Sequence, residues 1–299
     1  MAVESIDNAH IIQFSDRVHI VAQQIKARLR PHVEMRPMKG ETLAYDGLGS
    51  LEASQILGRN QPVQFADIAY LRRRISRQRF ALTLPIDEAD VRSMLTSPQS
   101  YYAEACVRAM ERVFDRVVVA ALFATVYTGE SFATAVTATA DGVETVNATA
   151  GLTYQSILQL NQNFIDNEVG NDMPENIVVG LAGDEYKSLM QEVELINDLY
   201  SRQHAIDKGR LVELVGTKIV QFGGAVPQPI LAVSAASVRS CFGMSSRGIC
   251  VGMSKEIGVK VEPRPDLVET TQVQVVFDFG AVRTEGVLVQ QINTTAVVI

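Results

Sequence analysis

The sequence has no tryptophan, only four histidines and only three cysteines among its 299 residues. It also lacks the glycine-rich nucleotide-binding pattern, the P-loop, the His-Glu-x-x-His zinc motif and the Gly-x-Ser-x-Gly nucleophile elbow. Asp278-Phe-Gly has the letters of the kinase magnesium motif, but no His-Arg-Asp or Ala-Pro-Glu sequence accompanies it. We therefore expect no enzymatic activity and no cofactor.

Two further absences concern the compartment. No basic segment followed by an apolar run opens the chain, and the longest apolar run, residues 117–126, is about half of the ~20 residues that span a bilayer. Cys106, Cys241 and Cys250 form an odd set with no Cys-x-x-Cys pair, which predicts buried free thiols in a reducing compartment. The sequence therefore predicts a cytoplasmic chain with no membrane partner.

What the chain does contain is the composition of an ordinary folded protein. Hydrophobic residues make up 47% and charged residues 20%, and at about 150 residues per domain the length suggests two units or one elaborated unit. The net charge of −7 argues against a general binder of polyanions. The charge is unevenly distributed, because residues 1–80 carry 12 basic against 8 acidic residues and residues 81–299 carry 15 against 26.

The first 80 residues differ in character from the rest of the chain. Residues 1–30 are polar and predict a partly helical arm. Residues 31–80 contain proline and glycine so often that no long helix fits, and their short β-compatible pieces end in a period-two strand over residues 80–86. Such a segment has little core of its own, while ordering it costs about 1–2 kcal/mol per residue. We therefore expect it to need a packing surface outside its own fold.

The longest helix is predicted next. Ser97 and Pro98 suit a helix start, and apolar residues then recur every three or four positions for about 25 residues, until Gly129 favours a stop. The charged residues of this segment, Asp115 among them, are expected on the opposite, exposed side of the helix.

The remaining chain predicts a mixed block followed by strands. Helices are expected after Thr153 and after Gly183, with an apolar strand over residues 177–181 between them. From residue 257 onward the pattern alternates with a period of two, which predicts strands to the end of the chain. Because those strands are expected to pack back onto the long helix, the block over residues 151–254 is interpreted as an insertion.

A run of arginines in the sequence Tyr70-Leu-Arg-Arg-Arg-Ile-Ser-Arg-Gln-Arg is the strongest local charge feature. Arginine pairs bidentately with carboxylates at protein interfaces, but it also contacts phosphate or lies on a solvated face. Because the rest of the chain is acidic and no aromatic stacking platform surrounds the run, we favour contact with carboxylates of another subunit and leave the other two interpretations open. The candidates for inter-subunit contact are Arg72, Arg73, Arg74, Arg77, Arg79, Lys39, Glu41 and Asp46.

The order of these parts resembles that of the major capsid proteins of tailed bacteriophages, which have the Hong Kong 97-like fold. The stretch from Arg72-Arg-Arg-Ile-Ser-Arg-Gln-Arg-Phe to Asp87-Glu-Ala-Asp is similar to the arginine-rich return strand and acidic turn that precede the spine helix of that family. Gly209-Arg-Leu-Val-Glu-Leu-Val-Gly-Thr-Lys-Ile-Val looks like the strand pair of its axial domain, and Phe279-Gly-Ala-Val-Arg-Thr-Glu-Gly-Val-Leu-Val looks like its terminal strands.

The resemblance implies an α+β, Hong Kong 97-like capsid fold with five parts. These parts would be an N-terminal arm over residues 1–30, an extended β loop over 31–80, a peripheral domain with the spine helix over 81–150, an inserted axial domain over 151–254, and return strands of the peripheral domain over 255–299.

The resemblance also implies a structural function. The chain would be a major capsid subunit that assembles with itself, as pentamers and hexamers, into the icosahedral shell of a virion in the cytoplasm of a bacterial host. The implied partners are a portal protein, scaffolding or decoration proteins, and packaged double-stranded DNA that is bound without sequence specificity. Because the chain begins almost directly with the arm, we expect a separate scaffolding protein or none.

Alternatives to a phage capsid stay open at this point. An encapsulin-like compartment shell shares the fold but encloses cargo proteins, and a cytoplasmic enzyme with an unmarked site is the third interpretation. Some capsid relatives join neighbours through a Lys–Asn isopeptide bond. Lys39 lies in the extended loop, but the sequence identifies no acceptor, so this bond is not predicted.

Overall fold

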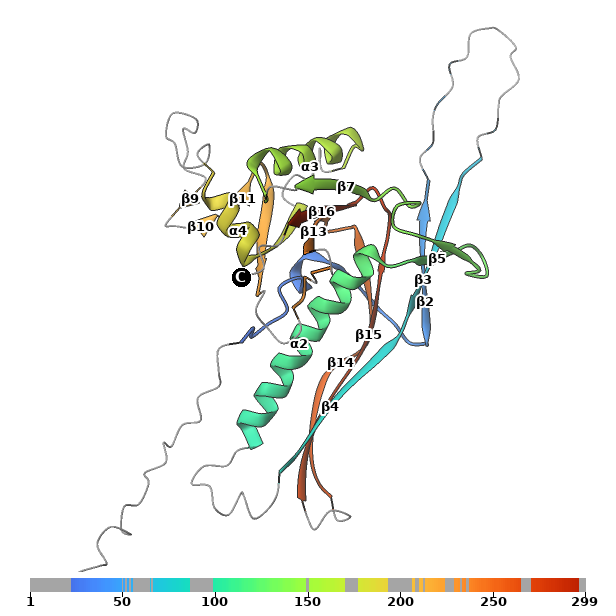
Figure 1. The fold of residues 1–299 in the computed structure, drawn as a ribbon. Helices are drawn as coiled ribbons and strands as arrows, with labels where there is room; N and C mark the ends of the chain where they lie inside the picture. The colour runs from blue at the N-terminus through green and yellow to red at the C-terminus, as the bar shows by residue number, and fades with distance from the viewer. Residues whose placement is uncertain are drawn as a thin grey trace, which may run out of the picture. The chain divides into compact units, whose positions relative to one another are not determined.

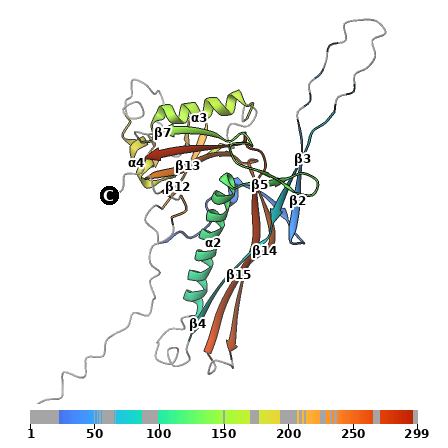
Figure 2. The same ribbon diagram turned by 45° about the vertical axis from the view of Figure 1, so that its right-hand side comes forward.

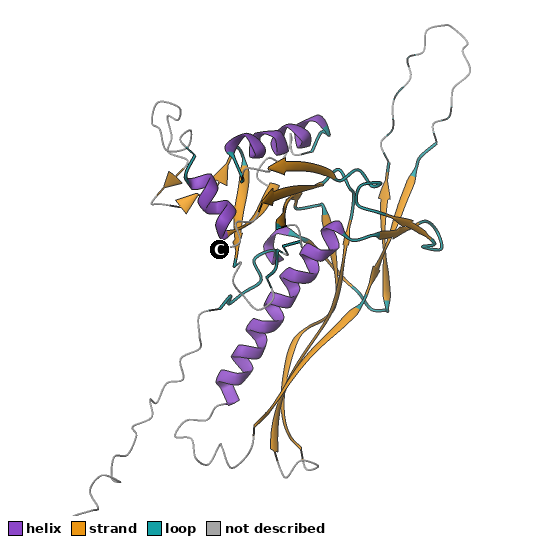
Figure 3. Ribbon diagram, in the orientation of Figure 1, coloured by secondary structure: helices purple, strands orange, loops and turns teal. Residues whose placement is uncertain are grey.

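The structure, a computed structural model, describes residues 23–49, 51, 53, 55, 65, 67–86, 99–148, 151–169, 177–192, 206–207, 210–211, 213–223, 229–231, 233–234, 237–264 and 270–295. Strands outnumber helices in this α+β fold (Figure 3). Two compact units are present. The first unit contains the described parts of Met1–Lys26, Arg79–Glu111 and Lys255–Phe277, and the second unit contains those of Ala27–Gln78, Arg112–Ser254 and Asp278–Ile299.

The first unit is built on parts of three strands and the first half of the longest helix. Its strands are β4 (Gln78–Ile86), most of β14 (Ile249–Arg264) and much of β15 (Thr270–Arg283), and β15 lies between the other two. In β15, Val273 and Val275 are fully buried while Gln274 between them is not, as strand alternation requires. β4 confirms the strand that the sequence predicts over residues 80–86.

Helix α2 (Gln99–Phe123) confirms the predicted long helix. Its apolar side chains repeat every four residues and are buried, so they form the stripe that faces the core. Within the second unit, Phe114 of this stripe packs against Phe279 of β15, with ring centroids 5.3 Å apart.

One charged residue of α2 does not lie where the sequence predicts. Asp115 is fully buried rather than exposed. Its two carboxylate oxygens accept the backbone N–H groups of Arg28 at 2.9 Å and Leu29 at 3.0 Å. A buried carboxylate is stable only with such donors, and here it fixes the backbone of residues 28 and 29 to the helix.

The second unit contains a six-stranded sheet covered by two helices (Figure 1, Figure 2). Helix α3 (Tyr154–Asp166) begins after Thr153, whose hydroxyl accepts the N–H of Ser156, and helix α4 (Gly183–Met190) follows the central strand. Both helices and that strand are confirmed. The sheet order is β11 (Glu213–Leu214), β12 (Thr217–Phe222), β8 (Ile177–Ala182), β13 (Val238–Ser245), β16 (Val289–Thr295) and β7 (Glu144–Ala148). A separate short pair joins β9 (Ile206–Asp207) and β10 (Arg210–Leu211).

The last strand departs from the sequence-based grouping of residues 255–299. β16 pairs antiparallel with β13 and parallel with β7, so it belongs to the same sheet as the block over residues 151–254. Strand periodicity predicts that β16 exists but not which strand it pairs with, because pairing is decided by contacts far away in the sequence. The boundaries of the capsid domains themselves stay predictions.

A second sheet contains the first three arginines of the run, Arg72, Arg73 and Arg74. It has the order β2 (Thr42–Leu48), β3 (Tyr70–Ser76), β5 (Val126–Thr128) and β6 (Thr134–Val136). The neighbouring strand β1 (Glu34–Pro37), which follows the short 3₁₀ helix η2 (Arg30–His32), pairs parallel with β14. Ile75 of β3 is fully buried in a cluster with Val126, Cys250 and Val282. The segment over residues 31–80 therefore has a firmer connection to the second unit than its composition predicts.

The three cysteines are free and buried, as predicted. Burial raises the pKa of Cys241 and of Cys250 to about 12, so both thiols stay protonated at neutral pH. No helix in the described part of the chain is both long and apolar enough to cross a membrane.

Candidate functional site: the β2–β3 hairpin

The β2–β3 hairpin has two ends with different surroundings. Its root is the part from the pair of Thr42 and Ser76 to the pair of Tyr45 and Arg73, and its distal end is the end at which Leu48 pairs with Tyr70. Between these ends the two strands are antiparallel and in continuous register. The root lies beside β5 and β15, whereas the distal end leads into residues that connect the two strands (Figure 1).

Strand alternation divides the arginine run between two faces. Neighbouring side chains of a strand point in opposite directions, so Arg72 and Arg74 share one face while Arg73 and Ile75 share the other. Arg73 and Ile75 are buried, and Arg72 is exposed. The run therefore does not act as one basic patch.

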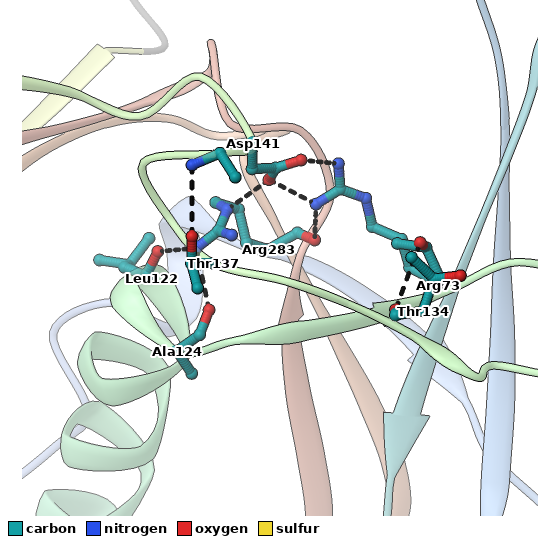
Figure 4. Close-up of polar contacts among 9 residues, drawn as sticks. Arg73, Leu122, Ala124, Thr134, Thr137, Asp141 and Arg283 are labelled. Atoms are coloured by element: carbon teal, nitrogen blue, oxygen red, sulfur yellow. Dashed lines mark hydrogen bonds and ion pairs between the residues drawn. The ribbon is translucent and has the colours of Figure 1, made fainter.

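The buried face contains an ion pair at the root of the hairpin (Figure 4). Arg73 donates from Nη1 to Oδ2 of Asp141 at 2.8 Å and from Nη2 to Oδ1 at 2.6 Å. Nη1 also donates to the backbone carbonyl of Arg283 at 3.1 Å. The side chains of Arg73 and Asp141 are only 3% and 9% exposed, so this bidentate pair is shielded from water.

A second guanidinium completes a buried triad of Arg73, Asp141 and Arg283. Arg283, at the end of β15, donates from Nε to Oδ2 of Asp141 at 2.7 Å, and its Nη1 donates to the carbonyls of Leu122 and Ala124. These carbonyls lie at the C-terminus of α2, where the last carbonyls have no partner in the helix and the helix dipole is negative. The helix end therefore helps to balance the second positive charge, and the triad joins β3, α2 and β15 within the second unit.

The protonation of Asp141 is coupled to this arrangement. Burial alone would raise the pKa of this carboxyl, but the hydrogen bonds from Arg73 and Arg283 outweigh that effect and hold the pKa below its usual value. Asp141 is therefore a carboxylate at neutral pH.

The exposed face of the hairpin makes weaker contacts. Arg72 donates from Nε to Asp46 directly across the strand pair, at 2.6 Å, but both side chains are about half exposed. The guanidinium of Arg74 lies over the ring of Tyr127, 4.8 Å from its centroid. Exposed pairs of this kind contribute little to stability because water and salt screen them.

The distal end exposes apolar side chains instead of charges. Phe65 is 96% exposed and Tyr70 is 76% exposed, and Leu48 and Leu51 are also mostly exposed. Large apolar side chains are normally covered in a folded protein, and several together indicate a surface that another molecule covers.

Comparison with known proteins identifies the family. A family model described as phage capsid protein matches residues 6–295. The chain belongs to this family. It is therefore a structural capsid subunit of a virion, and neither the compartment-shell nor the enzyme interpretation is favoured.

Solved structures give the fold of this capsid protein. The capsid of cyanophage P-SCSP1u is similar with a TM-score of 0.74 at 12% identity, covering 97% of this chain and 94% of that chain. The head of Helicobacter pylori bacteriophage KHP40 also has a TM-score of 0.74, at 10% identity and 99% coverage of both chains. The capsid of Ralstonia phage GP4 has a TM-score of 0.70 at 12% identity, covering 100% of this chain and 98% of that one. The predicted Hong Kong 97-like fold is confirmed by these likenesses. No curated protein matches the sequence.

The structure brings together some of the predicted contact residues of the capsid subunit and separates others. Asp46 meets Arg72, and the N–H of Arg77 donates to the carbonyl of Glu41 at 2.9 Å. Lys39 is exposed beside the root. Arg73 lies on the buried face of β3 and bonds to Asp141 of its own chain, and its contact with a neighbouring subunit stays a prediction. Arg79 belongs to the first unit.

Two residues of the triad were missed from the sequence. Asp141 lies in a Thr/Ala-rich segment with no periodicity, so no signal marks it. Arg283 has a signal, because its odd number continues the alternation of Val275, Phe277 and Phe279, all of which are buried. A charged residue in a buried register position predicts a buried partner. Among the described residues, no group of three or more His, Cys, Asp or Glu side chains is placed to hold a metal ion.

Proposed function

We propose that this chain is the major capsid subunit that assembles as pentamers and hexamers into an icosahedral shell around double-stranded phage DNA. Assembly takes place in the cytoplasm of the bacterial host, with a portal protein and with scaffolding or decoration proteins as partners. The DNA is enclosed without sequence specificity.

The observation that carries the proposal is the contrast along the β2–β3 hairpin. The root is fixed by a buried ion pair, while Phe65 and Tyr70 at the distal end have almost no cover from their own chain. Because burying a large aromatic side chain contributes about 1.5–3 kcal/mol, a neighbouring copy that covers these side chains gains stability from each of them.

The exposed polar residues of the hairpin give the same contact its specificity. We assign Lys39, Glu41, Asp46, Arg72 and Arg77 to the surface that meets the neighbouring copy. Both signs of charge occur in this group, so a copy in the wrong register would place like charges together. Arg73 is left out because its guanidinium is bound inside the chain.

The test is to remove the distal end without disturbing the root. The N–H of Gly49 donates to the carbonyl of Ala69 at 2.8 Å, so the two strands are close enough there to be joined by a short turn. Residues 50–68 are replaced by Asn-Gly, which favours a two-residue hairpin turn. We expect a subunit with unchanged unfolding midpoint that forms no closed shells by electron microscopy.

A matched control separates length from chemistry. In the control, residues 50–68 are replaced by a glycine-serine segment of the same length, which keeps the reach of the loop but removes its apolar side chains. We expect this variant also to fold and to form no shells. Closed shells from either variant would contradict the assignment of the distal end as the inter-subunit contact.

A further inference from the structure

The sheet of the first unit has one buried face and one hollowed face. Val273 and Val275 of β15 are buried on one side, while Gln274 and Val276 line a cavity of about 430 Å³ on the other. β15 lies between β4 and β14, so its residues form the floor of the cavity and the two neighbouring strands form its sides.

Positive charge is gathered around this cavity. Arg79 lines it from β4, and Lys255 and Lys260 line it from β14. Every charged side chain among the described residues that line it is a cation. Lys260 also pairs with Glu262 at 3.9 Å, but both side chains are more than 60% exposed, so this attraction is weak.

The position of the Lys255 side chain depends on the absence of a side chain at Gly258. A Cβ at position 258 would lie 3.4 Å from Cε and 3.9 Å from Nζ of Lys255, so the lysine side chain lies over the bare backbone of Gly258. Together with the amide of Gln274, the cavity therefore offers hydrogen-bond donors from three strands to a single bound group.

The charges around the cavity select the class of ligand. One carboxylate carries a single negative charge, which is less than the positive charge of the side chains that line the cavity. A phosphate group with a second ionisable oxygen carries about −1.5 to −2 at pH 7, two linked phosphates carry more, and a DNA strand presents successive phosphates with one charge each. Lysine is a strong point-charge partner for phosphate oxygens.

We propose that the cavity lined by Arg79, Lys255 and Lys260 is a binding site for phosphate groups. The phosphates come either from a free diphosphate or nucleotide or from the backbone of packaged DNA, and only the second source rests on the proposed function. Because the chain as a whole has a net charge of −7, such binding is confined to this cavity and is not spread over the surface.

The test uses the full-length chain with Lys255→Gln and Lys260→Gln combined. Pyrophosphate and a blunt duplex of about 30 base pairs are titrated separately by calorimetry, at several salt concentrations. We expect the wild type to bind at least one of the two probes and the double variant to bind that probe about tenfold more weakly. With duplex DNA, the slope of log K against log salt should fall by about 2, because two lysines no longer neutralise a phosphate each.

A matched control removes the same charge elsewhere. Lys26→Gln combined with Lys187→Gln changes two exposed lysines that do not line the cavity, and we expect it to bind like the wild type. If the wild type binds pyrophosphate more tightly than the duplex, the phosphates that occupy the cavity come from a free ligand. If it binds only the duplex, they come from the DNA backbone.

Several outcomes overturn the proposal. They are binding of neither probe by the wild type, or equal losses in the two double variants. A drop in particle yield of the Lys255 and Lys260 variant with unchanged phosphate affinity would instead show that an acidic segment of a second copy occupies the cavity. Whether the wild type forms closed shells is scored separately by electron microscopy, so failure of the proposed function is distinguishable from failure of this site.

Discussion

The root and the distal end of the β2–β3 hairpin belong to the same two strands, but their side chains differ in how far they are buried. At the root, Arg73 is buried and donates hydrogen bonds to the carboxylate of Asp141 and to the backbone carbonyl of Arg283. At the distal end, Phe65 and Tyr70 are left to solvent. The difference indicates that the hairpin is held in place by its own subunit, and in the proposed shell its far end is covered by another one.

Two adjacent arginines show the same contrast on the scale of single residues. Arg72 and Arg73 both pair with an aspartate, at the same distance of 2.6 Å, but only the second pair is shielded from water. The distance between partners alone therefore says little about energy, because burial decides how much the loss of a partner costs.

Replacing Asp141 with alanine is the change with the largest expected effect on this contrast. It leaves the guanidinium groups of Arg73 and Arg283 buried without a carboxylate, and removing one partner of a buried ion pair costs about 3–5 kcal/mol. We expect the free energy of unfolding of the unassembled chain, measured by urea denaturation, to fall by about that amount.

The matched control for that variant is Asp46→Ala, which breaks the exposed pair with Arg72. We expect no measurable change in the unfolding midpoint, because that pair is open to solvent. If D141A and D46A unfold at the same urea concentration, the root is not the more strongly held end.

Replacing a glycine at the root is expected to have the next largest effect on stability. A Cβ at Gly280 of β15 would lie 2.1 Å from the backbone carbonyl oxygen of Ser76, so Gly280→Ala forces β15 away from the end of β3. Overpacking of this kind costs about 1–3 kcal/mol. Gly47→Ala, farther out along the same hairpin, would place its Cβ 3.7 Å from Leu71, an ordinary separation, and should leave the urea midpoint unchanged. Equal midpoints for both variants would contradict the close approach at the root.

The smallest expected effect is a change in acid sensitivity. The pKa of Asp141 is held below its usual value, so its contribution to stability is complete above about pH 4, the ordinary range of an aspartate, and is lost as the pH falls through the lowered pKa. In urea titrations between about pH 5 and pH 2, the wild type should therefore lose stability more steeply than Asp141→Asn, which has no carboxyl to titrate. If the free energy of unfolding falls equally steeply with pH in both proteins, the titration of Asp141 does not contribute to the stability of the root.

Local elements of the fold followed from the sequence. The three- and four-residue spacing in α2, the cap at Thr153 and the alternation in β4 and β15 are signals that depend on neighbouring residues only. The order of parts also supported the capsid resemblance. These features could be predicted because the period of the apolar residues determines which face of an element is buried.

Pairings between distant segments could not be predicted in the same way. The partner of Arg73 is Asp141, 68 positions away. Strand β16, near the end of the chain, pairs with β7, which lies about 145 positions earlier in the sequence. Asp115 lies beside the apolar stripe of α2, where its charge suggested exposure, but two backbone N–H groups from residues 28 and 29 stabilise it in the core. In each case the decisive group comes from elsewhere in the chain, and composition or periodicity does not reveal it.

The state of the native thiols has a practical consequence for observing the hairpin in solution. Thiols react as thiolates, and the raised pKa values and burial of Cys241 and Cys250, with the buried Cys106, make all three native cysteines poor targets for maleimide dyes. A cysteine introduced at Phe65, which is almost fully exposed, would therefore take a fluorophore selectively without removal of the native ones. Its emission would then follow the moment at which one subunit meets the next.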